Sequence, residues 1–355
     1  MSTGEGAPEP LREHSLFGYT PEELVAQLGL EKRFRGQQLF LWMHRDGATD
    51  FDEMSNLPAA LREELTERFG SPYSTRVSTR NPDEDGSVKI AVESPDGAAV
   101  ESVLLQDREG RKTACLSSQV GCAMGCRFCR TAQMGFIRNL SAGEIVEQLY
   151  HLRNAYGKID NIVFMGMGEP LANLEQLRHA VDLLQHTDGL GMSLRRITVS
   201  TSGLTGAIYD MAEHGPSVRL ALSLITTDQR RREELMPIAK SNPLPKLKKA
   251  LEAYRDSHKR RITLEYVVMG GVNASPEDAE GLAALAKPLR AQVNIIPWNP
   301  VPELDFSEPS RDEVKHFSRM LEERGVTISQ RYTRGRGVNG ACGQLAVGLH
   351  EEESI

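Results

Sequence analysis

The chain has 355 residues, of which 39% are hydrophobic and 26% charged, and its formal net charge of −7 corresponds to a pI of about 5.8. This length and apolar content support one large domain with a small one beside it. No run approaches the roughly 20 apolar residues of a membrane span, which argues against a membrane protein. The acidic total argues only weakly against a nucleic-acid partner, because binding depends on local basic patches.

The two ends of the chain and its cysteine content predict the setting in which it works. Residues 1–14 are polar, lack the apolar core of a signal peptide and are expected to be a disordered tail. Residues 348–355 are expected to be a C-terminal tail. Three of the five cysteines fall within eight residues. Such clustering indicates metal or redox chemistry in a cytoplasmic protein rather than a disulfide framework.

The first elements are helical. Residues 15–72 are predicted to form a helical accessory domain, in which Thr20 and Pro21 start one helix and Gly36–His44 and Pro58–Phe69 form two more. Residues 73–112 are expected to be a β-hairpin linker, because Val88–Val92 and Val100–Leu105 flank the turn residues Pro95, Asp96 and Gly97.

From residue 113 to 347 strand and helix patterns alternate. The expected strands are Thr113–Ser117, Asn161–Met167, Arg196–Thr201, Val218–Leu224, Ile262–Val268, Gln292–Pro297 and Thr327–Tyr332. The expected helices are Ser141–Asn154, Leu174–Gln185, Gly203–Glu213, Leu244–Ser257, Pro276–Ala286 and Arg311–Arg324. Repeated βα units predict an α/β fold, a partial (β/α) barrel whose ligands bind at the C-terminal ends of the strands.

A cysteine loop follows the first strand of this predicted barrel. Cys122, Cys126 and Cys129 have the spacing C-x3-C-x2-C, with an aromatic residue before the last cysteine. Thiolates suit zinc or iron–sulfur clusters, and a structural zinc site needs a fourth ligand, which is not nearby. Three thiolates on a four-iron cluster leave one iron open for S-adenosylmethionine, whose cleavage gives a radical. A zinc loop with a distant fourth ligand is the alternative.

The sequence around this loop resembles the radical-SAM superfamily, and within it the RlmN/Cfr family of RNA adenosine methyltransferases. The matching stretches are Cys115–Cys122, Phe128–Phe136, Arg138–Leu140, Met165–Leu171, Val199–Gly203, Pro297–Pro300 and Ala341–Leu345. The likeness extends from about residue 16 to 347. It implies a [4Fe-4S] cluster on the three cysteines and S-adenosylmethionine as the second cofactor.

The resemblance also implies roles for other residues. Cys342 would accept a methyl group and Cys115 would resolve the RNA adduct by forming a disulfide with it, while Glu101 would handle a proton. Contacts to S-adenosylmethionine are implied for Gly168, Glu169, Ser200, Ser223, Leu224, Ile225 and Asn299. Ile225 departs from the family pattern of His or Asn, and its side chain cannot form a hydrogen bond.

Three functions are compatible with the sequence. The first is a methyltransferase for an adenosine ring carbon in ribosomal RNA, with transfer RNA as a further candidate; Thr131–Phe136 favours carbon 2 over the carbon-8 chemistry of the Cfr type. The second is a radical-SAM enzyme with another RNA substrate, and the third is a non-catalytic RNA-binding protein with a structural metal. A monomer served by a small electron-donor protein, flavodoxin or ferredoxin, is expected. The basic group Arg331, Arg334 and Arg336 is the best candidate for holding RNA phosphate near Cys342.

Overall fold

The computed structural model describes residues 15–330 and 334–347, so the predicted tails and Arg331 lie outside the described residues. Its centre is a ten-stranded sheet with the order β1-β2-β3-β4-β7-β8-β9-β10-β11-β12. The strands are β1 Arg76–Pro82, β2 Val88–Glu93, β3 Ala99–Gln106, β4 Lys112–Cys115, β7 Asn161–Phe164, β8 Ile197–Thr201, β9 Arg219–Ser223, β10 Ile262–Val268, β11 Gln292–Pro297 and β12 Thr327–Gln330.

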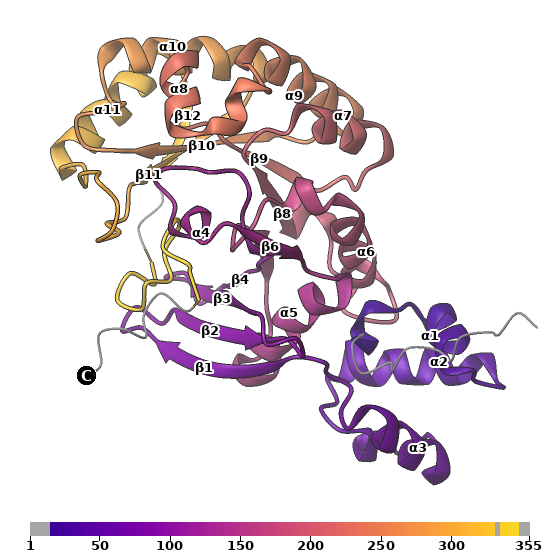
Figure 1. Cartoon of the computed structure of the whole chain (residues 1–355). Coiled ribbons are helices and arrows are strands. Elements are labelled where there is room, and N and C mark those ends of the chain that lie inside the picture. Colours follow the sequence, from indigo (N-terminus) through magenta and orange to yellow (C-terminus); the bar gives the residue numbers. More distant parts are fainter. Residues whose placement is uncertain (1–14, 331–333, 348–355) are drawn as a thin grey trace, which may run out of the picture.

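The sheet changes character at β4. Strands β4 and β7 to β12 pair in parallel, whereas β1 to β4 pair in antiparallel order. The parallel part confirms the predicted α/β fold with a partial barrel. The hairpin strands β2 and β3 continue the same sheet, so the barrel and the residues before it share one hydrogen-bonded layer (Figure 1).

Helices cover the outer face of the parallel strands (Figure 1). They are α5 Ala142–Tyr156, α6 Leu174–Gln185, α7 Thr205–His214, α8 Gln229–Leu235, α9 Leu244–His258, α10 Pro276–Leu289 and α11 Arg311–Glu323, and a short α4, Arg130–Gln133, follows the cysteine loop. The N-terminus of α5 is held by a capping box between Ser141 and Glu144, which satisfies two backbone donors. In the described part of the chain, no helix is both long enough and apolar enough for a membrane span.

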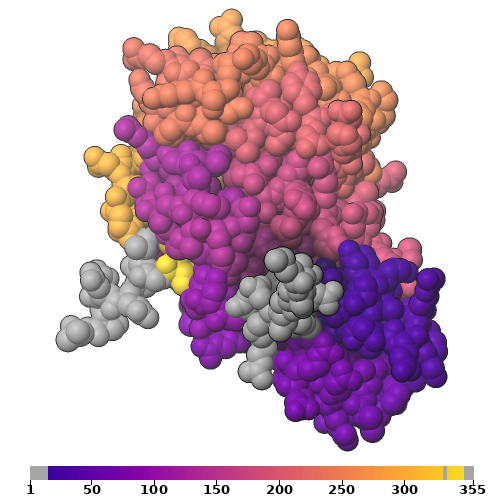
Figure 2. All heavy atoms as spheres, turned by 45° about the vertical axis from the view of Figure 1, so that its right-hand side comes forward, coloured from indigo at the N-terminus to yellow at the C-terminus, as the bar shows by residue number. Residues whose placement is uncertain are grey.

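The first part of the described chain is helical, as predicted. It contains η2 Leu16–Gly18, α1 Pro21–Leu28, α2 Arg33–Phe40, the π-helix η3 Leu41–Asp46, η4 Phe51–Glu53 and α3 Ala59–Phe69. Thr20 caps α1 and is followed by Pro21, as predicted, and Glu23 completes a capping box with it. The helix expected at Gly36–His44 begins earlier and ends as a π-helix. Figure 2 shows these residues as a lobe beside the barrel.

One buried carboxylate joins this lobe to the barrel. Glu147 of α5 is 0% exposed and accepts hydrogen bonds from Ser15 at one end of the lobe and from Ser74 and Thr75 at the other. The backbone nitrogens of Ser74 and Thr75 both lie 2.8 Å from its oxygens. Both ends of the lobe thus meet at one side chain, and Tyr150 and Arg153 of the same helix add hydrogen bonds to the carbonyl of His44 in the lobe.

Among the described strands and α-helices, β1, β5, β6, α4 and α8 were not predicted. Strand β1 is mostly exposed and its sequence, Arg-Val-Ser-Thr-Arg-Asn-Pro, lacks the apolar alternation of a half-buried strand. A separate hairpin, β5 Gln119–Gly121 with β6 Phe136–Asn139, is too short to give a pattern, and helix α8 is seven residues long. Strand β7 ends three residues before the predicted boundary, because the chain from Met165 turns into the site described next.

Candidate active site

A pocket opens where the parallel strands end. Its wall combines all three cysteines of the loop with strand-end residues from β8 to β11 and with Cys342 from the C-terminal segment. The predicted residues that line it are Cys122, Cys126, Cys129, Gly168, Glu169, Ser200, Ser223, Ile225 and Cys342. The structure therefore gathers residues that are up to 220 positions apart at the edge where a barrel binds its ligands.

The cysteine loop is held between β5 and α4. Gly121 has a φ of +73°, and a Cβ there would lie 1.9 Å from the carbonyl oxygen of Gly135, so only glycine fits. Burial, together with the charge of Cys129, raises the pKa of Cys122 to about 12, and burial raises that of Cys126 well above its usual value. These thiols therefore hold their protons unless a cation replaces them.

The thiol donors suit an iron–sulfur cluster. In residues 15–330 and 334–347, no three His, Cys, Asp or Glu side chains converge closely enough to hold one metal ion. An iron–sulfur cluster has its irons at separate corners, so its thiolate ligands stand apart around a shared pocket. Three thiols on the wall of one pocket match that arrangement.

The carboxylate of Glu169 is buried at the pocket, only 3% exposed. It accepts hydrogen bonds from the backbone nitrogens of Ser202, at 2.7 Å, and Leu171, at 3.1 Å. Burial raises its pKa, and these hydrogen bonds oppose the rise. Gly168 before it has a φ of +97° and packs where a Cβ would lie 2.6 Å from that of Gln119. The chain thus brings a carboxylate close to the three cysteines.

Ser200 and Ser223 end neighbouring strands, and their hydroxyl oxygens lie 3.4 Å apart. Ile225, two residues on, is 1% exposed and has a φ of +66°, a strained conformation for a β-branched residue. Asn273 stabilises this turn by donating a 2.7 Å hydrogen bond to the carbonyl of Ile225. The departure noticed in the sequence therefore lies on the pocket wall.

Two predicted cofactor residues do not line this pocket. Leu224 is fully buried, its backbone nitrogen bonds to the carbonyl of Glu265, and it is absent from the wall. Asn299 lines a neighbouring pocket instead and donates a 3.1 Å hydrogen bond to the carbonyl of Cys342. In the structure Asn299 is thus a support of the C-terminal segment.

The neighbouring pocket brings the remaining two cysteines together. Cys115, at the end of β4, and Cys342 both line it, along with Arg111 and Arg334. Neither is in a disulfide. Four residues line both pockets: Met165, Ile296, Cys342 and Leu345. Cys342 therefore stands at the boundary between the pocket of the cysteine loop and the pocket of Cys115.

Comparisons with known proteins agree with this arrangement. The sequence model of the radical SAM superfamily matches residues 116–283, and that of the ribosomal RNA large subunit methyltransferase N-terminal domain matches residues 16–70. A probable dual-specificity RNA methyltransferase RlmN of Treponema denticola is 49% identical over 331 residues, which cover 93% of this chain and 95% of the relative. A dual-specificity RNA methyltransferase RlmN of Anaeromyxobacter dehalogenans is 44% identical to this chain, and the matched region covers 91% of this chain and 88% of the relative. The chain belongs to the RlmN family of radical-SAM RNA methyltransferases.

A solved structure extends the likeness to three dimensions. The crystal structure of a radical SAM methyltransferase from Sphaerobacter thermophilus superposes with a TM-score of 0.88 at 39% identity, covering 93% of this chain and 98% of that one. The predicted RlmN/Cfr resemblance is thus confirmed at the level of the family.

Glu101 of this RlmN-family chain lies outside both pocket walls. Its carboxylate is 2.7 Å from the ammonium of Lys89 and accepts a 2.9 Å hydrogen bond from the backbone nitrogen of Ala346. Both side chains are nearly buried, 7% and 6% exposed. Further bonds hold the same segment, since Arg130 donates to the carbonyl of Gly343 and Thr131 to that of Leu345. Glu101 therefore anchors the segment that carries Cys342.

Sequence reasoning missed Arg232 and Lys89. Arg232 is the last of three consecutive arginines, a pattern that predicts solvent-exposed side chains, yet its side chain is 0% exposed. Lys89 lies in a strand pattern that gives no indication of its partner. Only the spacing of Arg232 from the apolar Leu235, three residues later on the same helix face, could have indicated burial.

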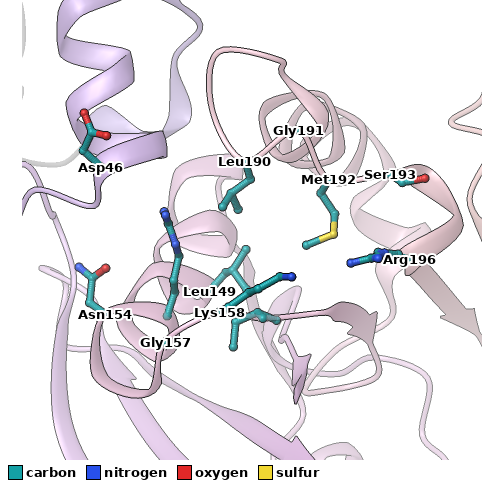
Figure 3. A pocket seen from close by; sticks show the side chains of 12 residues that line it. Asp46, Leu149, Asn154, Gly157, Lys158, Leu190, Gly191, Met192, Ser193 and Arg196 are labelled. Atoms are coloured by element: carbon teal, nitrogen blue, oxygen red, sulfur yellow. The ribbon is translucent and has the colours of Figure 1, made fainter. Parts of the chain in front are cut away.

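A further hollow lies between the accessory lobe and the N-terminal ends of β7 and β8. It is lined by Asp46, Leu149, Arg153, Asn154, Gly157, Lys158, Ile159, Leu190, Gly191, Met192, Ser193 and Arg196. Figure 3 shows Lys158 and Arg196 directed toward it from opposite sides. Ser200 and Arg196 lie at opposite ends of β8, so this hollow is remote from the three cysteines. Of the predicted phosphate-binding group, Arg334 lines the Cys115 pocket and Arg336 pairs with Glu308 at 2.6 Å.

Proposed function

We propose that this chain methylates carbon 2 of an adenosine in ribosomal RNA, with transfer RNA as a second substrate, through a methyl-bearing Cys342. The relatives named as dual-specificity RNA methyltransferases support the substrate class. The observation that carries the proposal is the position of Cys342 on the walls of both pockets. A group carried on this sulfur can face the cysteine loop from one side and an incoming base from the other.

Cys122, Cys126 and Cys129 would hold a [4Fe-4S] cluster, and Glu169, Ser200 and Ser223 would bind S-adenosylmethionine beside it. When bound, these cofactors supply the radical that an adenine ring carbon requires, because that carbon is not a nucleophile. The carboxylate of Glu169 could form an ion pair with the ammonium of the methionyl group. The two serine hydroxyls could form hydrogen bonds with the ribose or with the methionyl group. A small electron-donor protein, flavodoxin or ferredoxin, would supply the electron.

Cys115 would complete the reaction from the second pocket. Once a methylene group joins the Cys342 sulfur to the adenine ring carbon, attack by the Cys115 thiolate on that sulfur would form a disulfide and break the bond between sulfur and methylene. The methylene carbon would leave with the bonding electrons and take up a proton, which gives the methyl group of the released base. Both thiols line one pocket, which supports this pairing. The target base must leave its stack to reach Cys342, and Arg111 and Arg334 on the same wall could hold its phosphate.

Glu101 would act on this chemistry mainly through the C-terminal segment. Its buried carboxylate holds the backbone of Ala346, four residues after Cys342. The proton-handling role implied by the family would require this carboxylate to exchange its contact with Lys89 for one with the base.

Mass spectrometry of RNA tests the proposal. RNA is isolated from a strain lacking the gene and from strains carrying the wild-type, Cys342→Ala or Cys115→Ala gene. We expect 2-methyladenosine only with the wild type, and Cys342→Ala protein that keeps its 400-nm cluster absorbance after anaerobic reconstitution. Cys115→Ala should accumulate protein linked covalently to RNA. Methylation by Cys342→Ala would refute the proposed carrier, and 8-methyladenosine would refute the carbon assignment.

A further inference from the structure

Arg232 on helix α8 is a buried cation whose hydrogen bonding is incomplete. Its side chain is 0% exposed and is among the largest fully buried side chains of the described chain. A guanidinium carries five N–H donors and keeps its charge, so its burial costs free energy unless other groups compensate it. The hydrogen bonds and neighbours of Arg232 indicate which group compensates its buried charge.

Two of its nitrogens hold the strand ends of the pocket. Nη2 donates a 2.7 Å hydrogen bond to the carbonyl of Ser202, and Nε donates a 3.2 Å hydrogen bond to the carbonyl of Leu224. Both acceptors are neutral. Ser202 lines the pocket of the cysteine loop, and Leu224 lies between the pocket residues Ser223 and Ile225.

The third nitrogen, Nη1, is buried and has no hydrogen-bond partner among the described residues. Arg232 lies one helical turn before Leu235 and Met236, and its carbonyl accepts a 2.7 Å hydrogen bond from the nitrogen of Met236. Leu235 and Met236 belong to the apolar cluster against which Cys126 packs. The unsatisfied donor therefore belongs to a side chain on the segment that packs against the cysteine loop.

The backbone also attaches the cysteine loop to the segment that carries Arg232. The nitrogen of Arg127, next to Cys126, donates a 2.9 Å hydrogen bond to the carbonyl of Leu235, at the end of α8. Cys126, Phe128 and Met236 pack in one apolar cluster. The loop and α8 thus form one unit, and the hydrogen bond of the guanidinium to the carbonyl of Ser202 holds it beside the pocket that the thiols line.

We propose that Arg232 is a positioning residue that places a positive charge beside the pocket of the cysteine loop and favours the reduced state of the cluster bound there. The inference rests on the cluster of the proposed function. Thiolate ligands bring negative charge into a buried site, and reduction by one electron from an external reductant adds more. A cation in low dielectric stabilises each added charge, so it raises the midpoint potential, and Nη1 can donate a hydrogen bond to sulfur.

Two variants separate charge from hydrogen bonding. Arg232→Gln removes the charge but keeps an amide that can donate to the strand-end carbonyls. Arg232→Lys keeps the charge with fewer donors. Arg231→Gln is the matched control, because Arg231 is the adjacent residue of α8 and already pairs with Asp278 at 2.6 Å. Each full-length protein is reconstituted anaerobically, and its iron and sulfide content and thermal unfolding are recorded.

The deciding measurement is the midpoint potential of the cluster, from a dithionite titration followed by electron paramagnetic resonance without S-adenosylmethionine. We expect a more negative potential for Arg232→Gln and a wild-type potential for Arg231→Gln and Arg232→Lys. Unchanged potential in a folded, cluster-loaded Arg232→Gln protein would overturn the inference. An equal negative shift in Arg232→Gln and Arg232→Lys would also overturn it, because hydrogen bonding alone would then explain the effect.

The lysine variant keeps the test decisive if Arg232→Gln does not fold. A folded Arg232→Lys protein with a clearly more negative potential would contradict a role for charge. The proposed function fails separately, if the wild-type protein takes up no iron and sulfide or makes no 5′-deoxyadenosine. If the wild-type protein takes up the cluster and makes 5′-deoxyadenosine, the potentials of the variants test only the role of Arg232.

Discussion

Replacing Glu147 by alanine should weaken the docking of the accessory lobe onto the barrel. Glu147 accepts hydrogen bonds from the backbone nitrogens of Ser74 and Thr75, both at 2.8 Å, as well as from three hydroxyls. Each backbone donor that is left buried without an acceptor costs about 1–3 kcal/mol. The two together predict a loss of roughly 2–6 kcal/mol in the free energy of docking the lobe.

Hydrogen exchange with mass spectrometry measures this loss where it occurs. Amides of residues 15–75 should exchange by an opening reaction that is easier by that amount, while amides of β7 to β10 keep their protection. Glu147→Gln retains one acceptor oxygen and should lose about half as much. The exposed Glu63→Ala, in α3, is the control and should change stability by less than about 0.5 kcal/mol. A change below about 1 kcal/mol for Glu147→Ala in the lobe would refute the anchoring role.

Three further predictions concern charge and strain. Burial lowers the pKa of His44 to about 3 and that of His151 to about 4. Near pH 6.5 the two histidines bind protons in the unfolded chain but not in the folded chain. Their contribution to the free energy of unfolding is therefore complete above pH 6.5 and falls as the pH decreases. Between pH 6 and 5 the slope should approach about 2.7 kcal/mol per pH unit, roughly 1.36 for each histidine. Urea denaturation at each pH checks this, and His44→Phe should halve the slope. Lys89→Met leaves the carboxylate of Glu101 buried without its cation and should lower the free energy of unfolding, measured by thermal unfolding, by about 3–5 kcal/mol. The double variant Lys89→Met, Glu101→Gln should recover most of this loss, whereas additive losses would contradict the pairing. Ile225→Asn places a residue that tolerates a positive φ at the backbone φ of 66° and adds a side chain that can form a hydrogen bond. Calorimetry on the cluster-loaded protein should therefore show S-adenosylmethionine bound roughly threefold to tenfold more tightly than by the wild type. Weaker binding by a folded variant would mean that the apolar contact of Ile225 contributes more than the new hydrogen bond.

The parallel part of the fold could be predicted because its signals are local. Strand β10 was predicted with its observed bounds, Ile262–Val268, since a run of apolar residues between turn signals is typical of a buried strand. The capping residues of α1 and α5 lie within three positions of their partners, so the sequence shows them directly. Strand β1 gave no such signal: it pairs with β2 at the edge of the sheet and buries little.

The candidate site was predictable only in part. The spacing of Cys122, Cys126 and Cys129 identified the loop, since residues that share one cluster are close in sequence. The proximity of Cys115 and Cys342 came from the family resemblance alone, because no local pattern relates two residues so far apart. Arg232 was missed for another reason. Arginines in a charged helix are mostly exposed, and only tertiary packing of α8 against the cysteine loop decides which of them is buried.

The anchors of the C-terminal segment affect how the protein is made. Cys342 is held at the two pockets because Gly343, Leu345 and Ala346 bond back to Arg130, Thr131 and Glu101, and because Asn299 bonds to its own carbonyl. A ribosome synthesises these residues after every strand of the sheet. The pocket of the cysteine loop therefore gains this wall only when the last residues of the described chain have been synthesised.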